Sequence, residues 1–381
     1  MLNKFIFEKK IFFKKNKYSQ YKQIFDSKKK VLIFGAGGLG RLYHDNLEKK
    51  GIRTEAFIDN DLKVQGKKYK NTKIISLKEA KVIKNQLIII GSLLYTNQIY
   101  KQLKKNGFKS IFIPYILNIF SPKIFPLPQI DKMHKKIFNN NYNFNILKVK
   151  TLLSDDESKK VLSNLQKFRI TGDYKYIDKS KSKFPIFLES DILHLKEDEV
   201  YVDCGAYDGD TIKAFLSAKK NYNSIYAFEP DPKNLRKIRD LIKRNNLKNI
   251  HLLKEGVYNS NSWVKFICNN SFDSSISLKE VVKKNKAGKD YIHVTTIDDF
   301  FHNRKEKPTL IKMDIEGSEY RALDGAKDII RKHKPKLAIS VYHHPDHIWK
   351  IILKIYKINK NYKFYLRHLT EEIADTICYA V

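Results

Sequence analysis

The stretch that decides the fold is Val200-Tyr-Val-Asp-Cys-Gly-Ala-Tyr-Asp-Gly-Asp-Thr211. An apolar run leads into Asp203, and a D-x-G-x-x-x-G turn then leads into a helical pattern that begins near Asp210. Such a turn stands at the carboxyl end of a strand in a parallel α/β sheet, where Gly205 and Gly209 allow the backbone to come close to a ligand. The stretch therefore predicts a ligand pocket between a strand and a helix.

A second acidic residue ends the next predicted strand. The apolar run 224–228 is followed directly by Glu229. A carboxylate at this place suits the two hydroxyls of a ribose, because each hydroxyl can donate a charge-assisted hydrogen bond to it. Together with the glycine turn, Glu229 predicts a nucleoside site.

Length and composition predict a globular protein of more than one domain. The chain has 381 residues, of which 42% are hydrophobic and 12% aromatic, enough for two sizeable cores. Its three cysteines, Cys204, Cys268 and Cys378, are far apart and odd in number, which favours reduced thiols in a cytoplasmic protein over a disulfide framework. We expect Cys204 to be a small buried residue rather than a nucleophile.

The formal net charge of +33 suggests a nucleic-acid partner at first sight. Of the 74 basic residues, however, 64 are Lys and 10 are Arg, whereas bidentate contacts with phosphates and bases favour Arg. The composition therefore disfavours nucleic acid. It leaves weak contact with an anionic membrane surface, at the inner face of the membrane, or with an acidic glycan as alternatives. The longest apolar stretch, near 87–90, is far too short to cross a bilayer.

An α/β alternation occurs twice along the chain. In the first, a strand over 30–34 precedes Gly35-Ala-Gly-Gly-Leu-Gly40 and a helix, and Asp59 ends the next strand. A G-x-G-x-x-G match in this context predicts a small Rossmann-like domain over 30–117, after a basic arm over 1–29. The nucleotide or nucleotide-sugar site expected there consists of Gly35, Gly37, Gly38, Leu39, Gly40 and Asp59.

The segment 118–185 breaks this pattern and is interpreted as a linker followed by a helical cap. The linker includes the Asn-rich run 139–143. The second alternation fills 186–381, and its last two strands suit an antiparallel edge hairpin. An added pair of strands is expected near 263–268 and 291–295. The sequence thus predicts an α/β protein with a large sheet of seven strands after a smaller α/β domain.

Residues from about 152 to 381 resemble the FkbM-type S-adenosylmethionine-dependent methyltransferases. The resemblance rests on four motifs in order: VDCGAYDGDT at 202–211, FEP at 228–230, IKMDIEGSE at 311–319 and SVYHHPDHIW at 340–349. It implies the class I methyltransferase fold, S-adenosylmethionine as cofactor and, usually, O-methylation of a hydroxyl on a glycan or secondary metabolite. The first domain resembles Rossmann-type modules of bacterial sugar-modifying enzymes, which bind a dinucleotide such as NAD or a nucleotide sugar.

The cofactor site implied by this resemblance follows the carboxyl ends of the first three strands. Asp203 is expected to bind the ammonium of the cofactor or to order water, Glu229 the ribose hydroxyls, and Glu255 is expected near the adenine. The complete expected set is Asp203, Gly205, Ala206, Tyr207, Asp208, Gly209, Thr211, Glu229, Asp231, Glu255, Gly256, Val257 and Asp314.

Methyl transfer to a hydroxyl also needs a group that receives the proton. Candidates at the ends of the fourth and fifth strands are Asp314, Glu316, His343 and His344. A His of the pair is expected as base or orienter, because its pKa lies near working pH, and Asp314 is expected to hold substrate or cofactor. With Asp346 these side chains could bind a divalent cation. Their spacing shows no closed metal signature, and methyl transfer to an alcohol requires no metal, so no metal is predicted.

Three functions stay open on the sequence. The favoured one is O-methylation of a sugar or glycan precursor, for example of a surface polysaccharide. The second is a non-catalytic module that senses S-adenosylmethionine or assembles a glycan pathway. The third, an RNA methyltransferase, is disfavoured because Asp314-Ile-Glu-Gly317 stands where amino-directed base methylation uses an Asn/Asp-Pro-Pro-aromatic motif.

Overall fold

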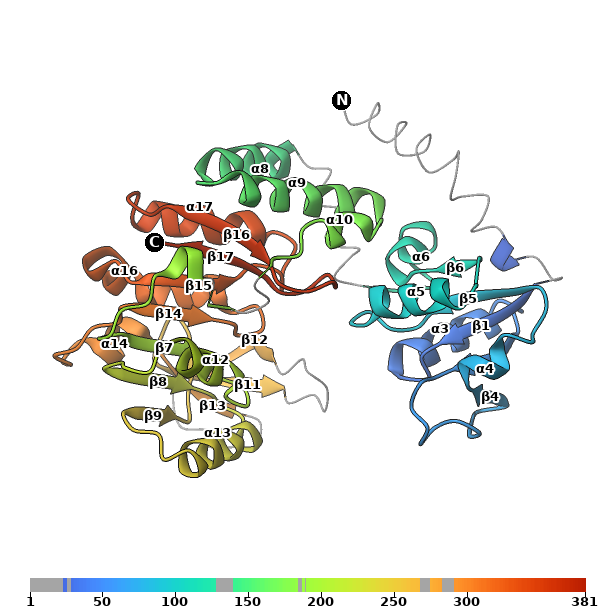
Figure 1. Cartoon of the computed structure of the whole chain (residues 1–381), viewed down its shortest axis with the longest axis horizontal. Coiled ribbons are helices and arrows are strands. Elements are labelled where there is room, and N and C mark those ends of the chain that lie inside the picture. The colour runs from blue at the N-terminus through green and yellow to red at the C-terminus, as the bar shows by residue number, and fades with distance from the viewer. Residues whose placement is uncertain are drawn as a thin grey trace. The chain divides into compact units, whose positions relative to one another are not determined.

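The computed structural model describes residues 23–25, 29–127, 140–183, 187–188, 190–267, 275–282 and 291–381. The chain divides into two compact units (Figure 1). Unit 1 comprises Met1–Tyr142, Leu165–Asp178 and Glu371–Ile373, and unit 2 comprises Asn143–Asn164, Lys179–Thr370 and Ala374–Val381. Cys268 and most of the expected basic arm lie outside the described residues. Among the helices that are described, none is long and apolar enough to span a membrane.

Unit 1 is built on a six-stranded sheet with the order β3-β4-β2-β1-β5-β6, parallel except for the β3–β4 pair. Its strands are β1 Lys30–Phe34, β2 Thr54–Ile58, β3 Lys68–Tyr69, β4 Thr72–Ile75, β5 Gln86–Ile90 and β6 Ile111–Phe112. Its helices include α3 Gly38–Glu48, α4 Leu77–Ala80, α5 Thr96–Lys105, α6 Pro114–Phe120 and α10 Lys175–Asp178. The order of the parallel strands is that of a doubly wound α/β sheet.

Both faces of this sheet are buried. Val31 and Ile33 of β1 pack on the face covered by α3, whereas Leu32 belongs to the core that includes Ile99 and Leu103 of α5. Successive side chains of a strand point to opposite faces, so a strand between two helical layers must be apolar at every position. This requirement explains why the strands could be found as short uninterrupted apolar runs.

Unit 2 contains the seven-stranded sheet that the sequence predicts, in the order β16-β17-β15-β14-β7-β8-β9. Its strands are β7 Val200–Cys204, β8 Ser224–Phe228, β9 Ile250–Leu253, β14 Leu310–Met313, β15 Lys336–Ser340, β16 Phe364–His368 and β17 Thr376–Ala380. Only β17 runs antiparallel, to both β15 and β16. The class I methyltransferase fold is thereby confirmed.

Helices cover both faces of this sheet. Ile212 and Phe215 of α12 pack in one core with Tyr201 of β7, whereas Phe300 and Phe301 lie edge-on to Tyr226 of β8. The helices of this unit are α8 Asn140–Leu152, α9 Asp156–Thr171, which continues into unit 1, α11 Ser190–Leu193, α12 Asp210–Ala218, α13 Pro232–Arg244, α14 Ile297–Phe301, α15 Glu319–Ala322, η2 Leu323–Ala326, α16 Lys327–His333 and α17 His347–Ile358.

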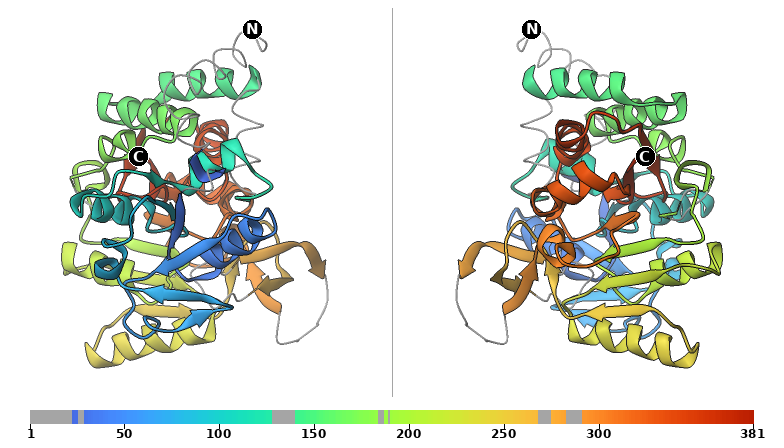
Figure 2. Two further views of the ribbon diagram at one scale, coloured as in Figure 1. Left: turned by 90° about the vertical axis from the view of Figure 1, so that its right-hand side faces the viewer. Right: turned by 90° about the vertical axis from the view of Figure 1, so that its left-hand side faces the viewer.

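Two elements differ from the sequence prediction. The expected pair of added strands exists, but it belongs to a four-stranded sheet of order β10-β13-β11-β12, made of β10 Gly256–Val257, β11 Ser262–Ile267, β12 Ser275–Val282 and β13 Tyr291–Thr295. Strand β12 was not predicted, and Figure 2 shows it with β11 (orange) projecting from the large sheet. The Asn-rich run interpreted as linker begins helix α8 instead, because burial of Val149 and Tyr142 outweighs the low helix propensity of Asn.

The turn between β1 and α3 offers a test of why its glycines are needed. A Cβ on Gly40 would lie 1.9 Å from the carbonyl oxygen of Gly35, whereas a Cβ on Gly37 would meet no atom within 4 Å. We expect Gly40→Ala to lower the free energy of unfolding of unit 1 by about 2–3 kcal/mol through overpacking. The matched Gly37→Ala variant should change it by less than about 0.5 kcal/mol. Urea unfolding followed by circular dichroism measures both, and equal midpoints would contradict the packing argument.

Candidate active site

The turn after β7 is fastened to the end of β8 by its own backbone. The N–H groups of Gly205 and Ala206 both donate to the carbonyl oxygen of Phe228, at 2.9 and 3.1 Å. The next N–H group, of Tyr207, donates to Oε2 of Glu229 at 2.9 Å. The predicted turn and the predicted acidic residue therefore form one structure, and the turn carries the remaining expected cofactor residues Asp208 and Gly209.

Gly205 brings this turn against the loop that follows β14. Its φ is +81°, and a Cβ there would lie 2.0 Å from the carbonyl oxygen of Asp314. The close neighbour of this glycine is thus a second loop of the sheet edge. Gly209, at φ +87°, precedes helix α12, and a Cβ on it would approach the side chain of Leu241 at 2.8 Å. Gly205 therefore requires glycine for both conformation and space, whereas Gly209 requires it for conformation, because the Leu241 side chain can move.

Asp203 lies beneath the turn and is engaged within the protein. Its side chain is fully buried; Nζ of Lys312 lies 3.0 Å from Oδ1, and the hydroxyl of Thr211 donates to Oδ2 at 2.5 Å. Lys312 also donates to the carbonyl oxygen of Gly205 at 2.6 Å. Burial opposes a charged ammonium, but the Asp203 carboxylate outweighs it, and the pKa of Lys312 is raised. The carboxylate expected to receive the ammonium of the cofactor is therefore paired with a lysine.

Glu229 lies at the carboxyl end of β8 with both oxygens directed by the backbone. Oε1 accepts from the N–H of Asp231 at 2.8 Å, and Oε2 accepts from that of Tyr207. Only 5% of the residue is exposed, and burial raises the pKa of its carboxyl to about 7. Asp231 itself caps α13 by accepting from the N–H of Lys233 at 2.7 Å. Each oxygen of Glu229 keeps a lone pair that can accept a hydroxyl.

Glu255 follows the neighbouring strand β9. Its Oε2 lies 3.2 Å from Nδ1 of His293, and its side chain is 33% exposed. Gly256 and Val257, also expected at the cofactor, form the short strand β10 and are buried. The structure thus places Glu255 at the same sheet edge as Glu229, while the two residues after it belong to the smaller sheet.

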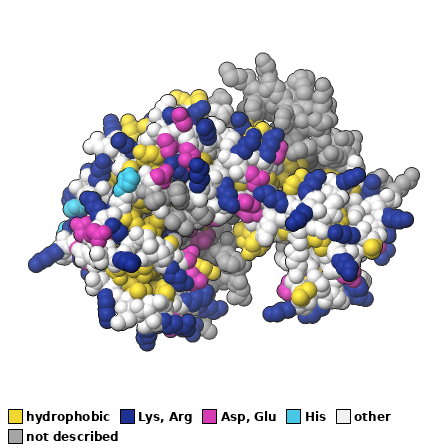
Figure 3. All heavy atoms as spheres, viewed as in Figure 1, with side chains coloured by type: hydrophobic (Ala, Val, Ile, Leu, Met, Phe, Trp, Pro, Cys, Tyr) yellow, Lys and Arg dark blue, Asp and Glu magenta, His cyan; other side chains and the backbone are white. Residues whose placement is uncertain are grey.

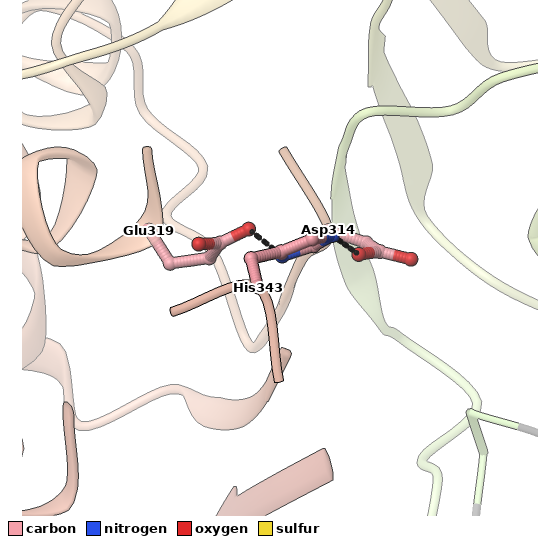
Figure 4. A group of neighbouring side chains, drawn as sticks. All are labelled: Asp314, Glu319 and His343. Carbon is pink, nitrogen blue, oxygen red and sulfur yellow. Dashed lines mark ion pairs between the residues drawn. The ribbon is translucent and has the colours of Figure 1, made fainter. Parts of the chain in front are cut away.

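A group of acidic residues and one histidine stands at the ends of β14 and β15. We name Asp314, Glu316, Glu319 and His343 the His343 cluster. Nδ1 of His343 lies 2.9 Å from Oε1 of Glu319, and Nε2 lies 3.5 Å from Asp314 Oδ1 and 3.4 Å from Glu316 Oε2. Figure 4 shows the imidazole ring between the carboxylates of Glu319 and Asp314. Three of the four catalytic candidates predicted from the sequence are thereby brought together.

Glu319 anchors this cluster. Its side chain is fully buried, and Oε1 accepts from the N–H groups of Ile315 at 2.9 Å and Gly317 at 3.2 Å. Nδ1 of His347 lies 3.5 Å from the other oxygen. Burial opposes its charge, but His343 holds the pKa of Glu319 well below its usual range. The backbone and two histidines therefore fix the position of this carboxylate.

The two predicted histidines differ in their protonation. Burial opposes a charge on His343, but the surrounding carboxylates outweigh it and raise the pKa of this ring well above its usual value. Partial desolvation and the neighbouring His347 lower the pKa of His344. The ring of His344 lies over Gly317, where a Cβ would come within 2.6 Å of its Nε2. At neutral pH His343 carries a proton, whereas His344 is free to accept one.

Sequence reasoning missed three residues of this site. Glu319 and Tyr342 were parts of quoted motifs but received no role, whereas Asp375 was not considered. The hydroxyl of Tyr342 donates to Oδ1 of Asp314 at 3.2 Å. Burial, with a contribution from Asp314, raises the pKa of Asp375 to about 6. Asp375 has φ +64° and Glu316 has φ +53°, a strained backbone of the kind that collects at functional sites.

Asp346, considered from the sequence as a cation ligand, lies apart from this arrangement. It precedes α17, and its Oδ2 forms an ion pair with Nζ of Lys350 at 2.7 Å. Cys204 is fully buried, and burial raises the pKa of its thiol. This environment disfavours the thiolate that a nucleophile requires.

The glycine turn of the first unit is held by an acidic side chain, as the turn after β7 is in unit 2. The N–H of Ala36 donates to Oδ2 of Asp59 at 2.8 Å, as that of Tyr207 donates to Glu229 in unit 2. Side chains at Gly37 and Gly38 would meet no atom within 4 Å. Leu39, the remaining predicted residue, is half-buried in α3. The turn is therefore open beside the first residues of a helix, next to the end of β2.

The basic side chains are spread over the surface. Figure 3 shows Lys and Arg on both units without a single continuous patch on the visible face. A nucleic-acid-binding surface usually has its Lys and Arg side chains clustered on one face. The distribution on the visible face therefore agrees with the Lys-rich composition, which disfavours a nucleic-acid partner.

Two family models match the chain. The model described as methyltransferase FkbM domain matches residues 203–376, and the model described as C2185-like, N-terminal, matches residues 27–111. A search of curated proteins finds no match. The first match includes the turn after β7, Glu229 and the whole His343 cluster.

The fold is shared with a solved structure. A methyltransferase FkbM from Methylobacillus flagellatus is 21% identical with a TM-score of 0.73, and the alignment covers 100% of this chain and 99% of that chain. An rRNA methylase from Streptococcus thermophilus is 16% identical over 51% of this chain and 90% of its own, with a TM-score of 0.31. A fibrillarin from Aeropyrum pernix, in complex with S-adenosyl-L-methionine, is 12% identical over 52% and 73%, with a TM-score of 0.30.

The buried Asp203–Lys312 pair predicts a large stability effect. Lys312→Ala leaves the Asp203 carboxylate buried without its cation, and we expect a loss of about 3–5 kcal/mol in the free energy of unfolding. The matched control is Arg331→Ala, which removes an ion pair whose partners are both 60% exposed and should cost less than about 1 kcal/mol. Urea unfolding compares the two variants, and equal losses would show that the buried pair is not needed.

Proposed function

We propose that this chain, a methyltransferase of the FkbM family, uses S-adenosylmethionine to methylate a hydroxyl of a sugar or glycan precursor. One observation carries the proposal: Gly205 of the nucleoside-type turn packs directly on Asp314 of the His343 cluster. A donor held by the turn would therefore present its reactive end beside groups that can receive a hydroxyl and its proton. Such adjacency is what in-line transfer between two bound molecules requires.

The donor site is proposed around Glu229. Both ribose hydroxyls can donate to its oxygens, which the N–H groups of Tyr207 and Asp231 already direct. Glu255, at the end of the next strand, is proposed near the adenine. The ammonium of the donor is expected at the rim of the turn, because Lys312 engages Asp203 beneath it.

In the proposed reaction an oxygen lone pair of the acceptor forms a bond to the methyl carbon. The carbon–sulfur bond breaks, its electron pair stays on sulfur, and S-adenosylhomocysteine leaves as a neutral thioether. The hydroxyl proton goes to His344, whose lowered pKa leaves it unprotonated at neutral pH. His343 orients the cluster, and Asp314 and Glu316 provide the carboxylates that hold the acceptor.

The first unit is proposed to bind a nucleotide, either NAD or the nucleotide part of a nucleotide sugar. The open glycine turn before α3 and Asp59 at the end of β2 support this proposal. Calorimetry with NAD and with nucleotide sugars tests it on the full-length chain. Gly37→Leu would fill the open side of the turn and should abolish binding there without changing S-adenosylmethionine binding.

Donor binding predicts a specific dependence on Glu229. Calorimetry of the full-length chain with S-adenosylmethionine should show binding, and Glu229→Ala should weaken it by about 1.5–3 kcal/mol through loss of charged hydrogen bonds. Asp328→Ala, which removes a carboxylate that is 60% exposed on α16, serves as the control and should leave affinity unchanged. No binding by the wild-type chain would defeat the proposed function.

The pKa of Glu229 also predicts how affinity varies with pH. Ribose hydroxyls donate best to the ionised carboxylate, and the folded protein ionises this group only around pH 7. Affinity for S-adenosylhomocysteine should therefore rise roughly tenfold from pH 6 to pH 8. Glu229→Gln should remove this component. In the unligated protein the same raised pKa acts oppositely, because stability falls as pH rises from the unfolded value near 4.3 to about 7.

The two histidines are distinguished by turnover. Once a methyl acceptor has been identified, His344→Gln should lower kcat by about a hundredfold, as expected for loss of a general base. The same variant should no longer lose rate at acidic pH. His343→Gln should also lower kcat but keep that acidic limb. His333→Gln, an exposed histidine at the end of α16, is the control. Unchanged rates in both site variants would remove the assignment.

The same measurements address the other two functions. Binding of S-adenosylmethionine without methyl transfer to any of a panel of sugars, nucleotide sugars and glycans would favour a sensing or assembly module. Methylation of RNA by the wild-type chain, lost in His344→Gln and persisting at physiological salt, would favour an RNA substrate.

A further inference from the structure

We propose that Asp314, Glu316 and Nε2 of His343 bind a divalent cation of the Mg²⁺ or Mn²⁺ class, which displaces the Nε2 proton to solvent and holds the acceptor through a pair of adjacent hydroxyls. The role of the cation rests on the proposed function, whereas its binding does not. No metal signature is visible in the sequence, because the ligands come from two separate loops. In the folded chain, ligand atoms of Asp314, Glu319 and His343 all lie within 4.8 Å of one another.

Glu319 fixes the orientation of the His343 ring. Nδ1 faces Glu319, a carboxylate that is fully buried and fixed by two backbone N–H groups. Histidines that bind metals commonly present one ring nitrogen to a carboxylate in this way, which fixes the ring and directs the other nitrogen at the metal. Glu319 is thus a support on the far side of the ring, and Figure 4 shows it opposite Asp314.

Nε2, the other ring nitrogen of His343, faces the carboxylates of Asp314 and Glu316. The side chain of His343 is only 10% exposed. Within the described part of the chain, Nε2 forms no hydrogen bond. Its nearest oxygens are Oε2 of Glu316 at 3.4 Å and Oδ1 of Asp314 at 3.5 Å. A buried ring nitrogen at ion-pair distance from two carboxylates, but hydrogen-bonded to neither, indicates a place where a cation can replace the ring proton.

The spacing suits a small cation. Adjacent ligands of an octahedral ion with bonds of about 2.1 Å lie about 3.0 Å apart. The two contacts of Nε2, at 3.4 and 3.5 Å, reach this spacing by closing a few tenths of an ångström. Two carboxylates and one imidazole form an oxygen-rich ligand set, which favours Mg²⁺ or Mn²⁺ over the softer metals that thiolates select.

The exposed side of the cluster leaves positions for substrate. The side chains of Asp314 and Glu316 are 23% and 36% exposed, whereas that of Glu319 is buried. The open coordination positions therefore face solvent, where water or two adjacent hydroxyls of an acceptor would bind. A bound cation lowers the pKa of a coordinated hydroxyl, which eases passage of its proton to His344. The preferred acceptor is accordingly a sugar with vicinal hydroxyls rather than an isolated alcohol.

Titration of the full-length chain with MnCl₂, followed by the electron paramagnetic resonance signal of free Mn²⁺, tests the site. We expect one site per chain, and Glu316→Gln and Asp314→Asn should each weaken it by about tenfold or more. Asp346→Asn is the control, because Asp346 pairs with Lys350 outside the cluster, and should bind as the wild type does. Urea midpoints of all variants check that each is folded.

No Mn²⁺ binding by the wild-type chain, or equal affinity in Glu316→Gln and Asp346→Asn, would overturn the proposal. Its failure can be separated from that of the proposed function, because S-adenosylmethionine binding is measured by calorimetry without added metal. A chain that binds the donor but not Mn²⁺ has a metal-free acceptor site. A chain that binds Mn²⁺ at Glu316 but not the donor keeps the cation site and loses the methyl-transfer assignment.

Discussion

The buried ion pair between Lys312 and Asp203 is the interaction on which the arrangement of the site depends. Lys312 lies in β14 and Asp203 in the adjacent parallel strand β7, in register with each other. The same ammonium donates to the carbonyl oxygen of Gly205. One cation therefore fixes both the end of β7 and the turn above it, and this places the turn against Asp314. A lysine with an apolar stem between two helical layers is costly unless it is paired in this way.

The Lys312–Asp203 pair places the turn after β7 between two different groups of side chains at the sheet edge. The turn after β7 is fastened on one side to Phe228 and Glu229 of β8, and on the other to the loop after β14. The side of β8 supplies the carboxylate of Glu229, directed by two backbone N–H groups, where we propose that the ribose binds. The side of β14 and β15 supplies the His343 cluster. Open α/β sheets bind ligands at the carboxyl ends of their strands, and here that edge carries two kinds of chemistry next to each other.

Most of the sheet could be predicted from sequence because its strands are buried on both faces. The run 224–228 was predicted with the bounds that the structure shows for β8, and the run 30–34 with those of β1 in the first unit. Strand β12 and helix α8 were not, since their polar residues carry neither a clear alternation nor a clear helical period. In the site, Asp314, Glu316 and His343 could be predicted because strand ends of a parallel sheet meet at one edge. Asp375 precedes an antiparallel strand, so the same rule gave no signal for it.

The chemical states of the site residues could not be predicted from residue type. Two consecutive histidines have equal intrinsic pKa values, yet His343 faces three carboxylates and His344 lies beside another histidine. Their pKa values therefore move in opposite directions. A protonated ring held by Glu319 is suited to orient neighbours or to exchange its proton for a cation, whereas an unprotonated ring on the same loop is suited to accept a proton. Burial and charge thus differ across a single peptide bond, and they suit the two neighbouring rings to different chemical roles.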